Sequence, residues 1–300
     1  MGPLLLSRGV VDRSAALRGD EEWLRRVWAD EATRVLLVHE GETLVRSRGA
    51  EASLALMSPA QAPEGPRYLL GVDAGGVPYF AVKAPFGSGA PAPDAYGAPM
   101  GLRQAGALLD DRDAGLFVYA VALEAWHAGH EHCPRCGSRT EIASSGHMRI
   151  CPGDGSQHFP RVDPAVIMLV RDDDDRVLLA RGPQWPQGRM SVLAGFVEPG
   201  ESLEQAVLRE VLEEVGVVAA DPRYMGSQPW PFPRSLMLGF FARALTTELR
   251  PDADEIAEAR WWTRDELGAA VRSGELGLPS QVSIARRLIE TWYGSRIDGD

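Results

Sequence analysis

Short apolar runs separated by glycine, proline and charged residues indicate a set of strands in the first part of the chain. The runs at 35–38, 68–72 and 79–82 are rich in Val, Leu, Tyr and Phe and are bounded by turn-forming residues, which is typical of strands. A stretch rich in glycine and proline at 85–99 predicts a long loop. After it, apolar positions recur at helical spacing over 102–127 and predict helices.

The second part of the chain mixes strands with helices. Two apolar runs, 165–170 and 177–180, flank four consecutive aspartates at 172–175. We expect a β-hairpin whose charged turn is a solvated loop rather than a metal site. No internal repeat of solenoid type is present. Further strands are expected at 191–196, 236–244 and 259–262, and further helices at 263–271 and 282–293.

Residues 195–217, GFVEPGESLEQAVLREVLEEVGV, hold the most specific pattern of the sequence. Ser202 followed by Gln205 forms a capping box, which is typical of the start of a helix. The helix is expected to run to about Val215 and to end at Gly216, because glycine readily adopts the left-handed conformation that follows many helices.

Three glutamates of this helix, Glu210, Glu213 and Glu214, are spaced so that their carboxylates are expected to converge on one face. Closely packed carboxylates repel one another unless a cation lies among them, and oxygen ligands suit Mg²⁺ or Mn²⁺. Arg209 precedes Glu213 by four residues and is expected to form an ion pair with it. The apolar residues are expected on the opposite face: Leu208, Val211, Leu212 and Val215.

A surface helix with solvated acids is the simpler interpretation, but it explains neither Gly195 nor Glu201. The whole run matches the Nudix signature, and the chain resembles a Nudix hydrolase. The matching positions are Gly195, Glu201, Arg209, Glu210, Glu213, Glu214 and Gly216, with apolar Val211 and Val217. The resemblance implies an α+β protein built on a Nudix α/β/α sandwich. It also implies that the three helix glutamates hold Mg²⁺ or Mn²⁺ for the attack of water on a diphosphate.

Residues 227–235, SQPWPFPRS, combine three prolines with two large aromatic side chains. Proline lacks a backbone donor, so this segment is expected to be a rigid piece that is neither helix nor central strand and that can present flat rings to a ligand. A loop in which Trp230 and Phe232 only fill a hydrophobic gap is the alternative. The segment resembles the motif of the NADH pyrophosphatase branch of Nudix hydrolases, which implies a dinucleotide with a nicotinamide end.

The cysteines are Cys133, Cys136 and Cys151, an odd number in a chain that shows no export signal. Such a count favours metal ligands or free thiols over disulfides. The CxxC pair and the position of the third cysteine are typical of a ribbon that binds tetrahedral Zn²⁺. The family that the chain resembles has a second CxxC here, whereas this chain has Asp154 at the fourth position.

The fourth zinc ligand is therefore open. We rank Asp154 first and His158 second, and His147 also lies between the two halves of the ribbon. A closed site with four ligands would be structural. A ribbon that has lost its metal and keeps its shape by packing, with reduced thiols, is the alternative. Three more histidines are expected at the surface rather than as ligands: His127, His130 and His132.

Composition fits a chain that buries two cores, since 45% of its 300 residues are hydrophobic and 24% are charged. The apolar start is too short for a signal peptide and no apolar run is long enough to span a bilayer, so we expect a cytoplasmic protein with no membrane partner. A net charge of −11 argues against an extended electrostatic grip on nucleic acid. The end group of a polyanion is still accessible to such a protein if metal ions neutralise the phosphates locally.

The expected domains are an N-terminal mixed α/β domain at 1–122, a small insert similar to a zinc ribbon at 123–160, and a Nudix hydrolase domain at 161–300. The opening phrase LSRG is similar to the N-terminal domain that accompanies this Nudix branch. We expect that domain to contribute to dimer contact or to the shape of the substrate pocket.

The resemblance implies further site residues. Glu255 would add a metal-binding carboxylate and is our candidate for orienting or deprotonating the water, while Glu201 would be more structural. Phe159 and Phe196 would place rings on either side of the nicotinamide, from one subunit or from two, and core packing is the alternative for both. The remaining contacts are assigned to Gln228 and Ser235 for polar groups, Trp230 for a flat ring, and Ala285 for the adenine side.

These expectations describe a homodimeric NAD(H) diphosphatase that converts NADH to reduced nicotinamide mononucleotide and AMP. Members of the branch that the chain resembles also remove NAD caps from RNA 5′ ends, and here we expect RNA contacts limited to the cap and the first nucleotides. One alternative is a broader Nudix hydrolase acting on ADP-ribose or other nucleoside diphosphate derivatives, which the intact 227–235 segment disfavours. Another is a noncatalytic nucleotide sensor, which the complete set of acids disfavours.

Overall fold

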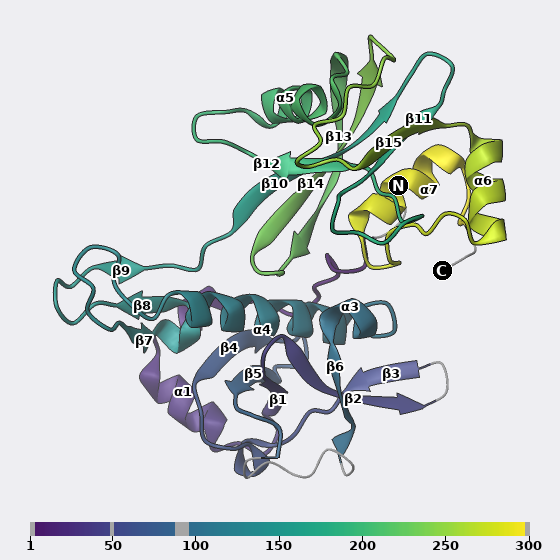
Figure 1. The fold of residues 1–300 in the computed structure, drawn as a ribbon. Coiled ribbons are helices and arrows are strands. Elements are labelled where there is room, and N and C mark those ends of the chain that lie inside the picture. The colour runs from purple at the N-terminus through teal and green to yellow at the C-terminus, as the bar shows by residue number, and fades with distance from the viewer. Residues whose placement is uncertain (1–3, 49–50, 88–95, 298–300) are drawn as a thin grey trace. The chain divides into compact units, whose positions relative to one another are not determined.

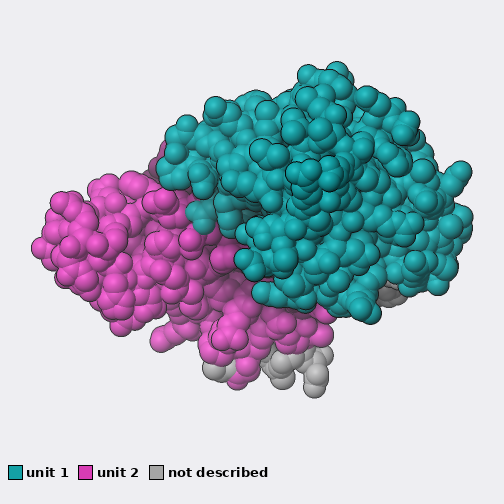
Figure 2. All heavy atoms as spheres, turned by 45° about the horizontal axis from the view of Figure 1, so that its top comes forward, with its two compact units in different colours: residues 1–7, 163–230, 235–300 teal, residues 8–162, 231–234 magenta. Residues whose placement is uncertain are grey.

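The computed structural model describes residues 4–48, 51–87 and 96–297. The chain forms two compact units, which Figure 2 colours separately. Unit 1 holds the described parts of residues 1–7, 163–230 and 235–300, and unit 2 holds residues 8–162 and 231–234. Within the described residues, no helix combines the length and the apolar character needed to cross a membrane.

Unit 2 contains two three-stranded sheets, with strand orders β1-β5-β4 and β3-β2-β6, and the long helix α4. The predicted strands at 35–38, 68–72 and 79–82 are confirmed as β1, β4 and β5, and the predicted helices over 102–127 are confirmed as α3 and α4. The bounds are α1 Glu21–Trp28, β1 Arg34–Val38, β2 Glu42–Arg48, β3 Glu51–Leu54, β4 Arg67–Val72, β5 Pro78–Lys83, β6 Ala98–Gly101, α3 Leu102–Ala105 and α4 Asp111–Gly129. Of the loop expected at 85–99, residues 88–95 lie outside the described residues and 98–99 begin β6 instead.

The ribbon is also part of unit 2, and it consists of the small sheet β7-β8-β9. Its strands are β7 Glu141–Ala143, β8 Met148–Ile150 and β9 Gln157–His158. Two buried histidines join it to the rest of the unit. His127 of α4 stacks on Tyr68 with 4.7 Å between ring centroids and donates through Nε2 to the Gly146 carbonyl. His147 donates through Nε2 to the Leu69 carbonyl.

The expectation that His127 lies at the surface is therefore wrong, because its ring fills the space between α4, β4 and the ribbon and is only 3% exposed. Of the two neighbouring histidines, His130 is half-buried and His132 is exposed. The His130 ring bonds to the Trp126 carbonyl through Nδ1.

Unit 1 is built on one sheet with strand order β13-β14-β10-β11-β15, and β12 pairs with β10. The hairpin expected at 165–180 is confirmed, because β10 and β11 pair antiparallel. The remaining strands and helices predicted for this part of the chain are also present. The bounds are β10 Asp163–Arg171, β11 Val177–Arg181, β12 Leu193–Phe196, α5 Leu203–Val215, β13 Ala219–Trp230, β14 Ser235–Ala244, β15 Glu258–Trp262, α6 Arg264–Ser273 and α7 Ile284–Tyr293.

Alternating side chains of β10 explain why this sheet is covered on both faces. Val166 and Met168 pack in the same cluster as Val211 of α5. Ile167 and Leu169, which point to the other face of the sheet, pack with α6 and α7. Figure 1 shows α5 on one face of the sheet and α6 and α7 on the other. The expected Nudix α/β/α sandwich is confirmed.

The acidic turn between β10 and β11 is more ordered than expected. Asp172 is buried and accepts hydrogen bonds from the backbone N–H and the Nε of Arg176, at 2.8 and 2.7 Å. Asp175 pairs with Arg264, and its carbonyl accepts from the indole N–H of Trp292. The prediction of a merely solvated turn is therefore wrong, since two of the four aspartates hold neighbouring elements in place.

Strand β13 was not predicted from the sequence. It lies at the edge of the sheet, where Pro229 pairs with Leu236 of β14, and its ladder carries two register shifts. An edge strand tolerates proline because only one side of its backbone must donate to the sheet. Residues 227–230 are thus the end of an edge strand, which agrees with the expectation that the SQPWPFPRS segment is no central strand.

Candidate active site and metal centre

Helix α5 carries the clustered acids, and both of its ends are as the sequence predicts. Ser202 and Gln205 form the capping box, with a 3.3 Å hydrogen bond from the Gln205 backbone to the Ser202 hydroxyl and a reciprocal one of 3.1 Å. Gly216 ends the helix with a φ of +70°, a conformation in which glycine is preferred. The position of every glutamate on α5 is fixed by these two ends.

The acids do not lie opposite the apolar face, and that part of the prediction is wrong. Glu210 and Glu214 are 8% and 7% exposed and lie beside fully buried Val211, whereas Leu212 is 52% exposed. The reason is that α5 turns Glu210 toward Gly195 of β12 and buries Glu214 one turn further along the helix. Glu213 remains at the surface.

Gly195 of β12 explains how the Glu210 carboxyl group fits against the sheet. A Cβ atom at residue 195 would overlap the Cδ and both oxygens of Glu210. Gly195 pairs with Val166 of β10, so its backbone is held in the sheet and has little freedom to move away. Residue 195 is therefore glycine for a steric reason, and the loop glycine and the helix acid of the sequence pattern belong to one site.

Arg209 connects the acids of the site. Its guanidinium donates to Glu201 through Nε and Nη2, both at 2.8 Å, and to Glu210 and Glu213 through Nη1, both at 2.9 Å. It also donates to the Phe196 carbonyl at 2.9 Å. The expected ion pair with Glu213 is confirmed, but the sequence did not reveal the four other hydrogen bonds. In the sequence, the only sign of these further hydrogen bonds is that Arg209 directly precedes Glu210.

The acids differ in their electrostatic environment. The hydrogen bonds from Arg209 and from the Glu198 backbone N–H lower the pKa of Glu201 to about 2, which suits a structural carboxylate. Burial is the main cause that raises the pKa of Glu214 to about 8, and the charges of Glu210 and Glu255 add to it. Burial also raises the pKa of Glu210. The buried acids therefore favour a compensating positive charge.

A divalent cation fits this arrangement. Glu214 Oε2 is buried and has no hydrogen-bond partner among the described residues, although buried carboxylate oxygens are normally paired. The charge of Glu255 acts on both Glu210 and Glu214, so a third carboxylate lies close to the buried pair. Carboxylate oxygens are the donors that Mg²⁺ and Mn²⁺ prefer. Arg209 donates hydrogen bonds to Glu210 and Glu213, and no three of the carboxylates of Glu210, Glu213, Glu214 and Glu255 have ligand atoms within 4.8 Å of one another.

The two phenylalanines assigned to the nicotinamide are exposed. Phe196, which follows Gly195 in β12 of unit 1, is 59% exposed, and Phe159, in unit 2, is 57% exposed. Large aromatic side chains are usually buried. Core packing, the alternative for both residues, is therefore excluded, and each ring offers a flat surface to a ligand.

The residues assigned to the SQPWPFPRS segment and to α7 separate into two groups. Trp230 and Ser235 face each other across the β13–β14 hairpin and are partly exposed. Gln228 is fully buried. Its Nε2 donates to the Val282 carbonyl at 2.8 Å, and its Oε1 has no hydrogen-bond partner in the part of the chain that the structure describes. Ala285 is 1% exposed in the core around α7. A substrate would therefore have to reach buried positions to contact the Gln228 and Ala285 side chains.

The ribbon brings together a second set of ligand atoms. One atom each of Cys133, Cys136, Cys151 and Asp154 lies within 4.8 Å of all the others, and among the described residues this is the only such group of three or more. Cys136 Sγ lies 3.3 Å from Cys151 Sγ, and Cys133 Sγ lies 3.7 Å from Asp154 Oδ2. Three thiols and one carboxylate form a donor set that suits tetrahedral Zn²⁺.

Hydrogen bonds from neighbouring groups hold Asp154 in place and favour its charged form. The Ser156 hydroxyl and backbone N–H donate to Asp154 Oδ1 at 2.6 and 2.9 Å and, with smaller contributions from the thiols, lower the pKa of Asp154. His158 bonds to Ser156 through Nε2 and is not part of the group. His147 bonds to Tyr119 and Leu69 and is not part of it either.

Three protein families match successive parts of the chain. Residues 32–126 match the "NADH pyrophosphatase-like rudimentary NUDIX domain", residues 129–159 the "NADH pyrophosphatase zinc ribbon domain", and residues 161–279 the "NUDIX domain". The chain is 42% identical over 304 aligned positions to "NAD-capped RNA hydrolase NudC" of Mycobacterium bovis, covering 96% of this chain and 94% of that protein. It is 45% identical to the protein of the same name from Stutzerimonas stutzeri, over 66% of this chain and 68% of that one.

Among solved structures, a Nudix hydrolase from Nitrosomonas europaea matches 55% of this chain and 94% of its own, with 22% identity and a TM-score of 0.44.

Proposed function

The chain belongs to the NudC family of Nudix hydrolases, and from this premise we propose that it hydrolyses the diphosphate of NADH and NAD, giving reduced or oxidised nicotinamide mononucleotide and AMP. The name of its relatives extends the proposal to removal of NAD caps from RNA 5′ ends. The observation that carries the proposal is the buried Glu214 oxygen, which has no hydrogen-bond partner within the described ranges and on which the charges of Glu210 and Glu255 act.

We assign the catalytic metal ions to Glu210, Glu213, Glu214 and Glu255, with Mg²⁺ or Mn²⁺ as the ions that suit four carboxylates. When bound, such ions lower the pKa of a water molecule and stabilise charge on phosphoryl oxygens. Glu201 and Arg209 orient the helix acids through the hydrogen bonds described above. Glu255, the acid outside the helix, is proposed to orient or deprotonate the water.

The dinucleotide's rings are assigned to exposed aromatic side chains. Phe196 follows Gly195, and its carbonyl accepts a hydrogen bond from Arg209, which also binds the acids. Phe159 supplies a second exposed ring. Offset stacking on such rings is favourable for a flat nicotinamide. Trp230 and Ser235 are proposed to contact the same end of the substrate, Gln228 to act from its buried position, and Ala285 to line the adenine side.

We assign Zn²⁺ to Cys133, Cys136, Cys151 and Asp154, as a structural ion with no open position for substrate. We further propose a homodimer in the cytoplasm, with domains at 1–122, 123–160 and 161–300, and with Phe159 supplied by one protomer or the other. Light scattering of the purified protein distinguishes a dimer from a monomer.

Product analysis with Mn²⁺ tests the function. NADH, NAD, ADP-ribose and a short NAD-capped RNA are compared side by side, with Glu213→Gln as the control. Nicotinamide mononucleotide formed selectively from the nicotinamide substrates, and lost with the control variant, supports the proposal. Equal cleavage of ADP-ribose would favour a broader Nudix hydrolase, and no cleavage by the wild type would favour a nucleotide sensor.

A further inference from the structure

An exposed tryptophan lies in a loop next to the segment of Glu255, and no function has been assigned to this loop. The loop joins β11 to β12 and carries Trp185, whose side chain is 44% exposed. The guanidinium of Arg189, itself exposed, lies 5.8 Å from the centre of the indole ring, within range for a cation–π contact. A large exposed aromatic ring beside an arginine is a surface on which a nucleobase can stack.

The loop is held in place at several points. Its ends are joined by two hydrogen bonds between Ala180 and Ser191, at 2.8 and 2.9 Å. Toward β12, Gly277 donates to the Gly188 carbonyl at 2.7 Å and accepts from Met190 at 3.1 Å. The Trp185 backbone N–H donates to the Gly182 carbonyl at 3.1 Å. Trp185 is therefore presented by a fixed backbone, which lowers the entropic cost of stacking on it.

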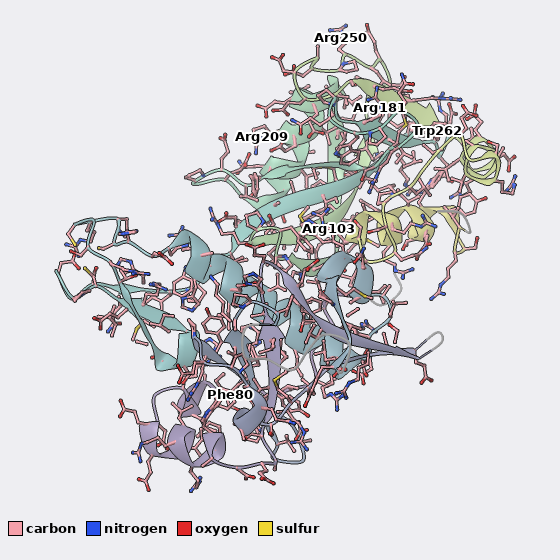
Figure 3. The ribbon with its side chains drawn as sticks, turned by 60° about the horizontal axis from the view of Figure 1, so that its bottom comes forward. Phe80, Arg103, Arg181, Arg209, Arg250 and Trp262 are labelled. Atoms are coloured by element: carbon pink, nitrogen blue, oxygen red, sulfur yellow. The ribbon has the colours of Figure 1, made fainter. Side chains whose placement is uncertain are left out.

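Arg181, at the end of β11 and labelled in Figure 3, links this loop to the segment of Glu255. Its guanidinium donates to the Trp185 carbonyl at 3.2 Å, and its backbone carbonyl accepts from Ala257 at 2.9 Å. A Cβ placed on Gly182 would lie 3.6 Å from the Glu255 carbonyl. The tryptophan loop therefore lies next to the segment that carries Glu255, one of the acids assigned to the metals.

Charge favours stacking over phosphate binding as the means of holding a polynucleotide. The chain has a net charge of −11, so a long basic groove for RNA phosphates is not expected. Stacking on an aromatic ring depends much less on net charge and accepts any base. Phe159 and Phe196 are already assigned to the dinucleotide. Of the exposed aromatic residues Trp185 and Tyr224, Trp185 is the one with an arginine beside it and with a loop that is hydrogen-bonded toward the Glu255 segment.

We propose that Trp185, with Arg189, forms a subsite for the base of the nucleotide that follows the NAD cap. The inference rests on the proposed function, because it places RNA beyond the cap at the same reaction centre. Free NAD has no such nucleotide. The subsite therefore raises the specificity constant for capped RNA and leaves that for free NAD unchanged.

The test compares Trp185→Ala and Trp185→Phe with wild type on NAD and on an NAD cap extended by one nucleotide. Tyr224→Ala is the matched control, since Tyr224 is another exposed aromatic residue of unit 1, at 56%. We expect Trp185→Ala to lower kcat/KM for the extended cap by roughly 5- to 100-fold, through KM, while NAD hydrolysis changes less than about twofold. Trp185→Phe should keep most of the preference, and Tyr224→Ala all of it.

Equal losses on NAD and on the extended cap would overturn the proposal, because the ring would then serve the dinucleotide itself or the fold. No loss on either substrate would overturn it as well. Binding of an NAD-capped oligonucleotide labelled at its 3′ end, measured with EDTA present, separates this inference from the proposed function. If wild type binds more tightly than Trp185→Ala in EDTA but cleaves neither NAD nor the capped oligonucleotide once Mn²⁺ is supplied, the subsite stands and the proposed function fails. Equal binding refutes the subsite.

Discussion

The Glu210 carboxyl group occupies the space that any side chain at Gly195 would need. We expect Gly195→Ala to push Glu210 away from its position against β12 and to lower kcat/KM for NADH by about 100-fold or more, because misplacing a reacting group by about 1 Å has an effect of this size. Steady-state kinetics with Mn²⁺ checks the prediction. Thermal unfolding of the same variant shows whether the sheet has remained intact.

Gly19→Ala is the matched control, because a Cβ at that residue would have no other described residue within 4 Å apart from its two chain neighbours, and its backbone has no positive φ. It should retain wild-type kinetics. Full activity in Gly195→Ala would show that Glu210 is free to move without consequence, and the assignment of Glu210 to the metal site would then be wrong.

Arg209 and Glu201 should behave as one unit in a double-mutant cycle. Two hydrogen bonds of 2.8 Å join them, and Arg209 also holds Glu210 and Glu213. Glu201→Gln and Arg209→Met should each lower kcat/KM, and the double variant should be little worse than the more damaging single one. Losses that simply multiply would contradict the connected arrangement.

The sequence predicted the elements that depend on local patterns and missed features that depend on tertiary packing. The capping box and Gly216 predicted the two ends of α5, and the apolar run at 165–170 predicted the central strand β10. The orientation of Glu210 and Glu214 was not predictable, because it depends on how closely α5 approaches the glycine backbone of β12. Strand β13 was not predicted because it contains prolines, which argue against a strand unless that strand lies at the edge of a sheet. The burial of His127 depends on Tyr68 and Gly146, which are distant in sequence.

Zinc content tests the ribbon. Wild type should contain about one zinc per chain, Asp154→Ala should lose most of it, and Asp154→Cys should retain it because a fourth thiolate completes the usual ligand set. His158→Ala should keep its zinc, since His158 bonds to Ser156 and not to the ligand group. Metal analysis of the four proteins by mass spectrometry checks this. Absence of zinc from the wild type would refute the assignment.

Lowering the pH should destabilise unit 2, because two of its histidines are buried. Burial lowers the pKa of both His127 and His147 to about 4, against 6.5 for the unperturbed side chain. Between these values the unfolded chain binds protons that the folded one excludes, so stability falls as the pH falls from about 6.5 toward 4. At pH 5 each of the two histidines should lower the free energy of unfolding by about 2 kcal/mol relative to pH 7.

Urea unfolding at pH 7 and at pH 5 checks this prediction. The loss of unfolding free energy between the two values should be smaller in His147→Gln than in the wild type. The exposed His132 is the matched control, and His132→Gln should lose as much as the wild type does. An equal loss in all three proteins would mean that the buried histidines do not cause the acid sensitivity.

The central claim is that the buried carboxylates of α5 are the reaction centre, and Glu214→Gln tests it most directly. The Oε2 atom of Glu214 is buried and has no hydrogen-bond partner in residues 4–48, 51–87 and 96–297, and burial raises the pKa of Glu214 to about 8. Replacing it with the neutral amide preserves shape and removes the charge that a metal needs. We expect NADH hydrolysis with Mn²⁺ to fall by about 100- to 1,000-fold while thermal stability is unchanged or higher. Undiminished hydrolysis by a folded Glu214→Gln protein would contradict the account.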